Sequence, residues 1–598
     1  MARRTQLQRH PKRIVRRYSH SVQAIGSSES CAADAAPGSP SPRGRMGRAQ
    51  RITGLEYALC SLIVLFGASI RVTGLTSGDL WADDAWITLP VRVGLREAIR
   101  MDVSTPLFVL LLREWASVDV ASTPFVQLLP LLASLLAIAA VWWLVRTVGG
   151  RMWTRVLVTT LAAVNPMAVV YATRVKEYSI EELLGVLLLI TLVKTIQRPA
   201  PGRLMALLGL SVVACVTSGA LVLFVAGILI AATIQGLRTG LQRDRFWLAT
   251  VFGTALAMGA SYLIFYNHIP PLLNAFWSPF EVSSLNQFPL THTAGLIGNG
   301  IAHGFVGVPL QVGPFPYTYQ LTNTGFAVAL ATAAVVFVLM VALMAGALWI
   351  TRAGLTGAGT AAIASTSVIL IAMLASVTGH VPLGGGRTDL WWYPAAWCLI
   401  AIVLEAAFTM FDPLVARQST HGRKLITIAS SILLVVIVVP FGIDNRSWYP
   451  AQDVRALVLQ HRAEIRPTDW IDFSSYNSWS WALYGLGPFH IWFNRGKVHT
   501  EKGWVVVNDK FDVQQILNTD PSSICTRTRR IWWIGVNSSA NNPSSYRLSG
   551  PSASVINPPG SVFTKFLSLG WQESQLILGQ GVHAILYTHP GTCRRTRS

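Results

Sequence analysis

Charged residues are scarce in this sequence. Asp, Glu, Lys and Arg together make up 13% of its 598 residues, against about 25% in a typical soluble protein. Hydrophobic residues make up 52%, and the mean hydropathy is +0.45. This composition excludes a soluble globular protein, because most of the chain must face something other than water. Several apolar runs approach the roughly 20 residues with which a helix crosses a bilayer, so we expect a multi-spanning α-helical membrane protein.

Acidic residues are the scarcer of the two charges. The sequence has 28 Asp and Glu against 48 Lys and Arg, which gives a formal net charge of +20. The basic excess is spread over short loops and the two ends, which argues against nucleic-acid binding. It is densest in residues 1–53, where the stretch 26–44 has too few apolar residues to form a core. Because no apolar run precedes a small-residue cleavage site, we interpret residues 1–53 as a disordered basic cytosolic tail.

The apolar runs predict eleven transmembrane spans. They cover residues 54–74, 124–146, 156–172, 181–196, 204–218, 219–236, 246–266, 325–350, 359–378, 389–411 and 425–441. If the N-terminus is cytosolic, nearly every loop that then falls on the cytosolic side is rich in Arg and Lys, as the positive-inside rule requires. An odd number of spans places the C-terminus outside the cytosol. We therefore expect a multi-pass protein of the cell membrane with its C-terminus extracytoplasmic.

Three regions outside the membrane are large enough to carry a site. The predicted transmembrane domain, residues 54–441, contains a first outer loop at 75–123 and a long outer loop at 267–324. After it, residues 442–598 contain short segments rich in β-branched and aromatic residues, such as "DWIDF", "GWVVVND", "RRIWWIGV" and "HAILYTH". These segments are typical of strands, and "SYNSWSWALYG" reads as a helix. We expect a small extracytoplasmic α/β domain.

Cysteines are few, and most of them fall in apolar surroundings. Three lie within predicted spans and one in the tail, where we expect plain apolar packing: Cys60, Cys215, Cys398 and Cys31. Cys525 and Cys593 alone fall in the predicted outer domain. Because an extracytoplasmic compartment is oxidising, these two are candidates for a disulfide.

An acidic pair stands out in the first outer loop. Asp83 and Asp84 lie between Trp81 and Trp86 in "SGDLWADDAWITLP". One reading is that both carboxylates face water and cap a helix that starts at Ala85. The other is that they take part in chemistry at the membrane surface. The tryptophans fit either a sugar-stacking role or an interfacial position.

Several cations lie on the predicted outer side, where the positive-inside rule disfavours them. Arg174 and Lys176 follow the third span, and Arg387 precedes the tenth, after three glycines. Three arginines of the first outer loop recur every four residues and would share one helix face: Arg92, Arg96 and Arg100. Such cations meet either lipid headgroups or a phosphate group bound at the site, since charge-assisted contacts to phosphate are strong.

These motifs resemble the GT-C glycosyltransferases, especially the bacterial membrane mannosyl- and aminoarabinose-type transferases. "LWADDAWITLPVR" resembles their Leu-Trp-x-Asp-Glu-Ala segment, with Asp83 in the Asp place and Asp84 in the Glu place. "NPMAVVYATRVKEYSI" resembles their Ser-Pro-x-x-Val-Tyr-Tyr-Ser-Gln-Glu-Ala-Arg-x-Tyr loop, with Lys176 in the Arg place and Tyr178 in the Tyr place. "GRTDLWWYPA", which begins one residue before Arg387, resembles the start of their late Arg-containing span.

The resemblance covers mainly residues 54–200, and the sequence departs from the pattern at several positions. "STPLFVLLLREW" resembles the family's His/Lys-Pro-Pro-Leu-Tyr segment, but Ser104 and Thr105 stand where His or Lys and Pro are usual. Arg174 stands where the family has Glu. These departures concern residues near the donor phosphate, so they bear on which sugar is used and on any dependence on metal.

The resemblance implies a transferase that moves a sugar from a polyprenyl-phosphate carrier to an extracytoplasmic acceptor: a cell-envelope glycan, a lipid or a protein. A carboxylate would act as general base on the acceptor hydroxyl. The leaving phosphate needs only neutralisation, which cations or a divalent metal can supply. No His, Asp and Glu cluster has convincing metal-ligand spacing, and His292 and His303 in the long outer loop are weak candidates.

Two other functions remain open at this stage. A transporter or flippase for lipid-linked sugars keeps ionisable residues near the membrane midplane, whereas the predicted spans hold few charges in their deep part. Glu405 is the exception and lies toward the predicted cytosolic end. A non-catalytic scaffold that displays the outer domain would not need acids and cations together.

Overall fold

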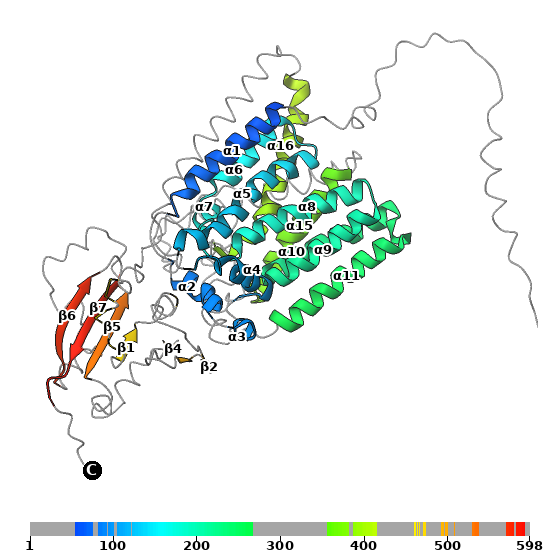
Figure 1. The fold of residues 1–598 in the computed structure, drawn as a ribbon. Helices are drawn as coiled ribbons and strands as arrows, with labels where there is room; N and C mark the ends of the chain where they lie inside the picture. The colour runs from blue at the N-terminus through cyan, green and yellow to red at the C-terminus, as the bar shows by residue number, and fades with distance from the viewer. Residues whose placement is uncertain are drawn as a thin grey trace, which may run out of the picture. The chain divides into compact units, whose positions relative to one another are not determined.

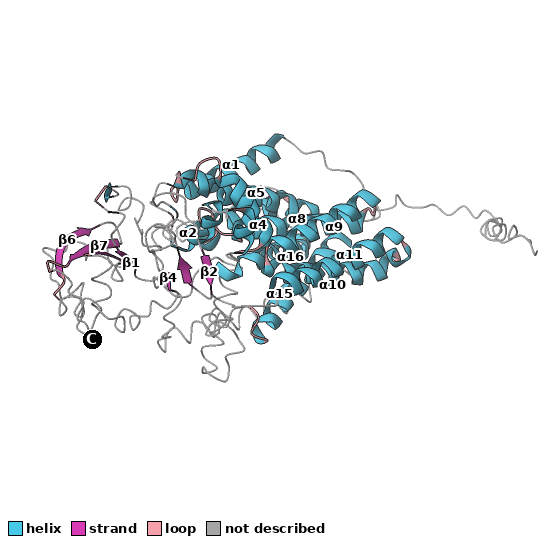
Figure 2. Ribbon diagram, turned by 60° about the horizontal axis from the view of Figure 1, so that its bottom comes forward, coloured by secondary structure: helices cyan, strands magenta, loops and turns pink. Residues whose placement is uncertain are grey.

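The computed structural model describes residues 54–75, most of 80–266, 356–381 and 387–415, and short segments between 460 and 591. Several predicted features therefore lie outside the described residues: the tail 1–53, the loop 267–324 with His292 and His303, the spans 325–350 and 425–441, and Cys525 and Cys593. Helices make up the described chain up to residue 415, and strands dominate it from residue 470 onward (Figure 2).

The long helices coincide with the predicted spans in the described part of the chain (Figure 1). The helices that lie on these spans are α1 (Gly54–Val72), α5 (Thr123–Thr147), α6 (Met152–Val164), the short α7 (Pro166–Tyr171), α8 (Tyr178–Gln197), α9 (Pro201–Thr217), α10 (Gly219–Thr239), α11 (Arg245–Ser261), α15 (Thr356–Val377) and α16 (Tyr393–Val415). The first outer loop folds into short helices: α2 (Ala82–Thr88), η2 (Leu89–Arg92), α3 (Leu95–Arg100) and α4 (Pro106–Ala116). Three more short pieces are η3 (Leu241–Arg243), η4 (Tyr262–Tyr266) and η7 (Arg387–Trp392).

Six helical segments of the described chain are long and apolar enough to cross a membrane by length and composition. Several of them carry large apolar side chains that point away from the protein, above all α1 and α11. Leu65 and Leu256, for example, are 65% and 74% exposed. Water would penalise such surfaces, whereas lipid tails accept them. The fold is that of a polytopic helical membrane protein.

Successive helices run in opposite directions between two ends of the bundle. Arg155 in the first turn of α6 donates to Glu56 in the first turn of α1, with 2.7 Å between Nη1 and Oε1. Arg146 in the last turn of α5 lies 3.8 Å from the same carboxylate. Gln197 at the end of α8 reaches the carbonyl of Thr147 at the end of α5.

Glu405 of α16 lies at this same end, where it accepts a hydrogen bond from the N–H of Arg151 just before α6, so we call it the Glu405 end. The opposite end, where Asp84 pairs with Arg174 before the start of α8, is called the Asp84 end.

The predicted third span, 156–172, is two helices rather than one. Pro166 lacks a backbone N–H and disfavours helical geometry at the residue before it. Asn165 accordingly leaves the helical region, with φ −55° and ψ 120°, and its side chain caps α7 by accepting from the N–H of Ala168. The break ends α6 at Val164, so the chain turns before it reaches Arg174.

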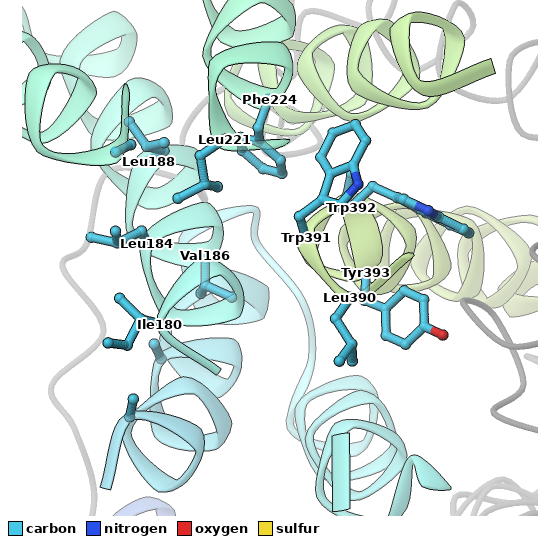
Figure 3. Close-up of a cluster of buried hydrophobic side chains, with 14 of the residues drawn as sticks. Ile180, Leu184, Val186, Leu188, Leu221, Phe224, Leu390, Trp391, Trp392 and Tyr393 are labelled. Atoms are coloured by element: carbon cyan, nitrogen blue, oxygen red, sulfur yellow. The ribbon is translucent and has the colours of Figure 1, made fainter. Parts of the chain in front are cut away.

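The core at the Asp84 end is an apolar cluster formed by α8, α10 and η7 (Figure 3). It contains Trp391 and Tyr393, which are almost fully buried, and Phe224. Gly185 on α8 allows this packing, because a Cβ there would lie 3.0 Å from the Pro394 ring and 3.3 Å from Phe224. Small residues at helix contacts are the usual means of close packing in membranes.

The C-terminal part contains two sheets. One has the strand order β1-β5-β7-β6, with β1 (Trp470–Phe473) parallel to β5 (Arg530–Val536), and with β7 (Val582–Thr588) antiparallel to both β5 and β6 (Gln572–Leu578). The other is β2 (Trp492–Asn494), β3 (Lys497–His499) and β4 (Val507–Asn508), all antiparallel. The strands predicted at "DWIDF", "RRIWWIGV" and "HAILYTH" are confirmed, and β4 covers two residues of "GWVVVND". Strands β2, β3 and β6 were not predicted from the sequence; the first half of β6, Gln-Glu-Ser, is polar.

A turn next to this sheet is tied to β6. Glu464 accepts hydrogen bonds from His461 at 2.8 Å and from Gln575 of β6 at 2.7 Å. These bonds lower the pKa of Glu464 below its usual value, and the bond from His461 has the larger effect. Because Glu464 is exposed, we assign this contact no part in stability.

Candidate active site at the Asp84 end

The helix α2 carries the acidic pair. It begins at Ala82, three residues earlier than the capping hypothesis required, so both aspartates are helical. The side chain of Asp84 is fully buried, since the neighbouring Ala85 and Leu89 turn into the core. The hydroxyl of Thr88 donates to the Asp84 carbonyl at 2.7 Å. For Asp84, the reading of a loop carboxylate in water is therefore wrong.

Arg174 is the cation that meets this acid. Its Nη1 lies 3.5 Å from Oδ2 of Asp84, and its side chain is 16% exposed. A buried carboxylate is stable only with a partner that compensates its lost hydration. Two motifs about 90 residues apart in the sequence thus meet in one ion pair. The order of the motifs along the sequence could not predict this contact.

Lys176 and Tyr178 follow directly in the same segment. The N–H of Lys176 donates to the carbonyl of Arg174 at 2.8 Å, so the two residues belong to one tight turn. Tyr178 begins α8, and its ring stands edge-on to Tyr171 at a centroid distance of 5.2 Å. Arg174 and Lys176 are therefore close together in the short turn between α7 and α8.

The segment before α4 reaches the same place. The hydroxyl of Ser104 donates to Oε2 of Glu177 at 3.2 Å. Thr105 donates to the carbonyl of Thr217 at the end of α9. Ser104 and Thr105 are the residues that replace the family's His or Lys and Pro, and they lie beside the start of α8.

Sequence reasoning missed three buried charges at this end. Glu181 and Glu182 in the first turn of α8 are each 2% exposed, and Arg71 in the last turn of α1 is 1% exposed. Glu181 accepts a hydrogen bond from Ser218, and Glu182 interacts electrostatically with Arg71. The sequence-based expectation concerned the deep part of the spans, and these three residues lie at the span ends. The signal was present, because two adjacent glutamates at the start of an apolar run are costly in a membrane.

Arg387 lies in η7, which packs against α8. The structure describes its backbone but not its side chain, and the same holds for Asp83 in α2. Two residues after Arg387, Asp389 is fully buried, and Nε1 of Trp392 lies 3.5 Å from its carboxylate. The backbone of Arg387 is thus at the Asp84 end, and the contacts of its side chain stay a prediction.

The arginine stripe of the first outer loop does not form. Arg92 ends η2, whereas Arg96 and Arg100 lie in α3, so the three do not share one helix. Gly94 separates the two elements. Nε of Arg92 donates to the carbonyl of Leu483 at 3.0 Å, which ties this loop to the C-terminal part of the chain.

Glu405 lies at the opposite end of the bundle. It accepts a hydrogen bond from the N–H of Arg151 at 2.6 Å, and its carboxylate is 3.5 Å from the guanidinium of the same residue. The hydroxyl of Thr154 also donates to it. The carboxylate of Glu405 is thus paired with Arg151, at the end of the bundle opposite Asp84.

Among the described residues, no group of three or more His, Cys, Asp and Glu side chains is arranged to hold a metal ion. Asp84, the carboxylate that a metal would most naturally use, faces the guanidinium of Arg174 instead. The described part of the site therefore does not fit a metal ion, and we derive no step through one.

Comparisons with known proteins give structural neighbours only. No family model matches the chain, and a search of the curated proteins finds no match. The archaeal oligosaccharyltransferase AglB from Archaeoglobus fulgidus, in complex with an inhibitory peptide and a dolichol-phosphate, is similar with TM-score 0.46 and 12% identity, over 80% of this chain and 69% of that chain. ArnT from Cupriavidus metallidurans in the apo state gives TM-score 0.47 and 11% identity, over 89% of this chain and 98% of that chain.

A second structure of ArnT from Cupriavidus metallidurans, bound to undecaprenyl phosphate, gives TM-score 0.44 and 10% identity, over 89% of this chain and 97% of that chain. AglB and ArnT are GT-C glycosyltransferases, the group that the outer-loop motifs resemble. At these low identities and TM-scores the overlap carries no functional argument. What the protein does must be inferred from the residues of its own Asp84 end.

Proposed function

We propose that the protein is a membrane glycosyltransferase. It takes a sugar from a polyprenyl-phosphate carrier and transfers it to an acceptor outside the cytosol, a cell-envelope glycan, a lipid or a protein. The reaction takes place at the Asp84 end, which faces the extracytoplasmic side of the cell membrane. The C-terminal domain lies on that side as well, and the basic tail lies in the cytosol.

The ion pair between Asp84 and Arg174 supports this proposal most directly. It joins the acidic motif of the first outer loop to the cationic turn before α8, 3.5 Å apart. An acid that accepts a proton and cations that bind a phosphate must be neighbours if both act on one sugar. A scaffold without chemistry has no need to bury a carboxylate against an arginine at a membrane surface, since such pairs seldom add net stability.

The transfer needs one base and a cluster of cations. The acceptor hydroxyl attacks the anomeric carbon and gives its proton to the carboxylate of Asp83, while the bond from that carbon to the phosphate oxygen breaks. The electron pair of that bond leaves with the polyprenyl phosphate. General-base catalysis of this kind contributes roughly 10²–10⁴ in rate.

The leaving phosphate is held by Arg174, Lys176 and Arg387 in this mechanism. Fixed cations stabilise the charge that develops on the phosphate, and they need no reorganisation when the bond breaks. Because phosphate is already a good leaving group, no second acid is required, in contrast to glycoside hydrolysis. Asp84 orients the site through Arg174, and Tyr178 lines the donor phosphate as the motif match implies.

The transporter and scaffold alternatives are separated by one experiment. Purified protein in vesicles is given a panel of polyprenyl-phosphate sugars with a labelled sugar, with and without candidate acceptors, and free polyprenyl phosphate is quantified. A transferase releases polyprenyl phosphate in an acceptor-dependent manner. A flippase moves intact donor between leaflets without releasing it, and a scaffold does neither; either result would refute the proposal.

A further inference from the structure

Arg71 bridges three helices from a fully buried position at the Asp84 end. Its Nε donates to the Ser134 hydroxyl of α5 at 2.9 Å. Its Nη1 donates to the Gly67 carbonyl of its own helix at 3.2 Å and to the Ala163 carbonyl of α6 at 2.5 Å. Nη2 lies 3.4 Å from the Ala162 carbonyl. One guanidinium thus connects α1, α5 and the last turn of α6.

Arg71 donates to two carbonyls of α6, those of Ala162 and Ala163, that have no helical N–H partner because of Pro166. In an unbroken helix the Ala162 carbonyl would accept the N–H four residues later, but that residue is Pro166, which has none. Asn165 then leaves helical geometry, so the last carbonyls of α6 have no helical partners. Arg71 supplies the missing donors, and its positive charge also suits the negative end of the α6 dipole.

The α6 break leads directly to the turn that holds Arg174. Only α7 separates them, and Gly74, two residues after the end of α1, lies against this turn: a Cβ on Gly74 would lie 2.5 Å from the hydroxyl of Thr173. Arg174, the next residue, forms the ion pair with Asp84. The end of α1 and Gly74 after it therefore contact the α6 end on one side and the residue before Arg174 on the other.

We propose that Arg71 is a positioning residue, which fixes the α6–α7 break and thereby sets the place of Arg174 opposite Asp84. This inference rests on the proposed function, because it treats Arg174 as a phosphate ligand. Arg71 does not touch the substrate in this scheme. Its fork geometry is essential, since a lysine offers one point charge and cannot reach Ser134 and the carbonyls of α6 together.

The test measures the affinity of the purified full-length protein for undecaprenyl phosphate, together with its thermal stability. The variants are Arg71→Lys, Arg174→Ala and the double variant. The matched control is Arg155→Lys, because Arg155 is 4% exposed and joins the same two helices, α1 and α6, at the opposite end. Arg155 donates to the Gly150 carbonyl and to Glu56, so both substitutions remove one buried fork.

We expect Arg71→Lys and Arg155→Lys to lower the melting temperature to a similar extent. Arg71→Lys should also weaken binding about fivefold or more, whereas Arg155→Lys should leave affinity within about twofold of the native value. Coupled residues give non-additive effects, so Arg71→Lys should cause no further loss in the Arg174→Ala background. Equal losses of affinity in both lysine variants, or additive losses of affinity in the double variant, would overturn the positioning role.

Two results separate this inference from the proposed function. If Arg174→Ala itself binds undecaprenyl phosphate at native affinity, the phosphate role fails and the positioning role fails with it. If Arg174→Ala weakens binding and Arg71→Lys does not, only the positioning role is refuted.

A second variant decides the matter if Arg71→Lys does not fold. Gly74→Ala should weaken binding, because its Cβ would clash with Thr173. Gly74→Ala combined with Thr173→Ala removes the clashing atoms and should recover most of the affinity. Native affinity in Gly74→Ala, or no recovery in the combined variant, contradicts the inference.

Discussion

In the described part of the chain, buried charged residues occur at the two ends of the helical bundle, and several are paired across elements distant in sequence. Asp84 meets Arg174 at one end, and Glu56 meets Arg155 at the other. Removing one partner of a buried pair typically costs about 3–5 kcal/mol, because the other charge is left without compensation. Arg174→Ala should therefore lower stability as well as donor affinity, so its affinity is read together with its melting temperature.

Lys176 gives the cleaner test at the residue scale. It lies in the same turn as Arg174, and the proposal assigns it to the donor phosphate. Losing a hydrogen bond to a charged group costs about 1.5–3 kcal/mol, so Lys176→Ala should weaken donor binding and transfer tenfold to a hundredfold. Membrane insertion and melting temperature should not change.

The comparison set for Lys176 contains Arg174→Ala and Arg387→Ala. Donor binding and transfer are measured by titration of the polyprenyl-phosphate sugar. Unchanged kinetics in all three variants would mean that these cations meet only lipid headgroups.

The motif residues of the site could be predicted from the sequence, but the buried residues that pack around them and position them could not. Asp84, Arg174 and Tyr178 stand out because short motifs carry them. Arg71 lies near the end of an apolar run, where averaging over a window hides a single charge, and only packing shows that it is buried together with Glu182. The contact of Asp84 with Arg174 is a tertiary fact that no local pattern contains.

At the element scale, the apolar runs predicted where the described spans lie, because about 20 apolar residues in a row leave few alternatives. Breaks inside these runs were missed. Pro166 splits the third span, although a proline after an asparagine is a recognised signal for a helix boundary. Gly94 splits the arginine stripe of the first outer loop. In both cases the regular spacing of residues in the sequence continues across a residue at which the helix is interrupted.

The crossing of α10 and α15 depends on one glycine. A Cβ on Gly227 would lie 2.6 Å from the Val368 side chain and 2.8 Å from its backbone nitrogen. Since the backbone cannot yield as a flexible side chain does, we expect Gly227→Ala to destabilise the protein by about 1–3 kcal/mol, seen as a lower melting temperature in detergent.

The control for Gly227 is Gly209→Ala on α9, where a Cβ meets no atom within 4 Å. Alanine is the better helix former by about 1 kcal/mol, so this variant should be neutral or slightly stabilising. Equal melting temperatures for the two variants would contradict the close helix crossing.

At the scale of the whole molecule, the alternating helices agree with the basic and non-basic loops of the sequence. The contacts of Glu56, Arg146 and Gln197 gather the arginine-rich helix ends at the Glu405 end. We expect that end to face the cytosol, following the positive-inside rule. The Asp84 end and the C-terminus then face outward.

A fusion reporter tests this topology. A reporter that is active only in the cytosol, fused after Ser598, should stay inactive, whereas the same reporter fused in the loop between α10 and α11 should be active. A bright fusion at Ser598 would refute the topology and remove the proposed access to an extracytoplasmic acceptor.

The central claim is that a carboxylate of the first outer loop activates the acceptor, and Asp83→Asn tests it most directly. The substitution keeps the shape of the side chain and removes its basicity. With the polyprenyl-phosphate sugar that turns over in the vesicle assay, we predict a turnover lower by about a hundredfold or more, with native affinity for undecaprenyl phosphate and a native melting temperature. Asp84→Asn should lower turnover less. Native turnover in Asp83→Asn would show that the base lies elsewhere, and inactivity of Asp84→Asn alone would show that the two roles are reversed.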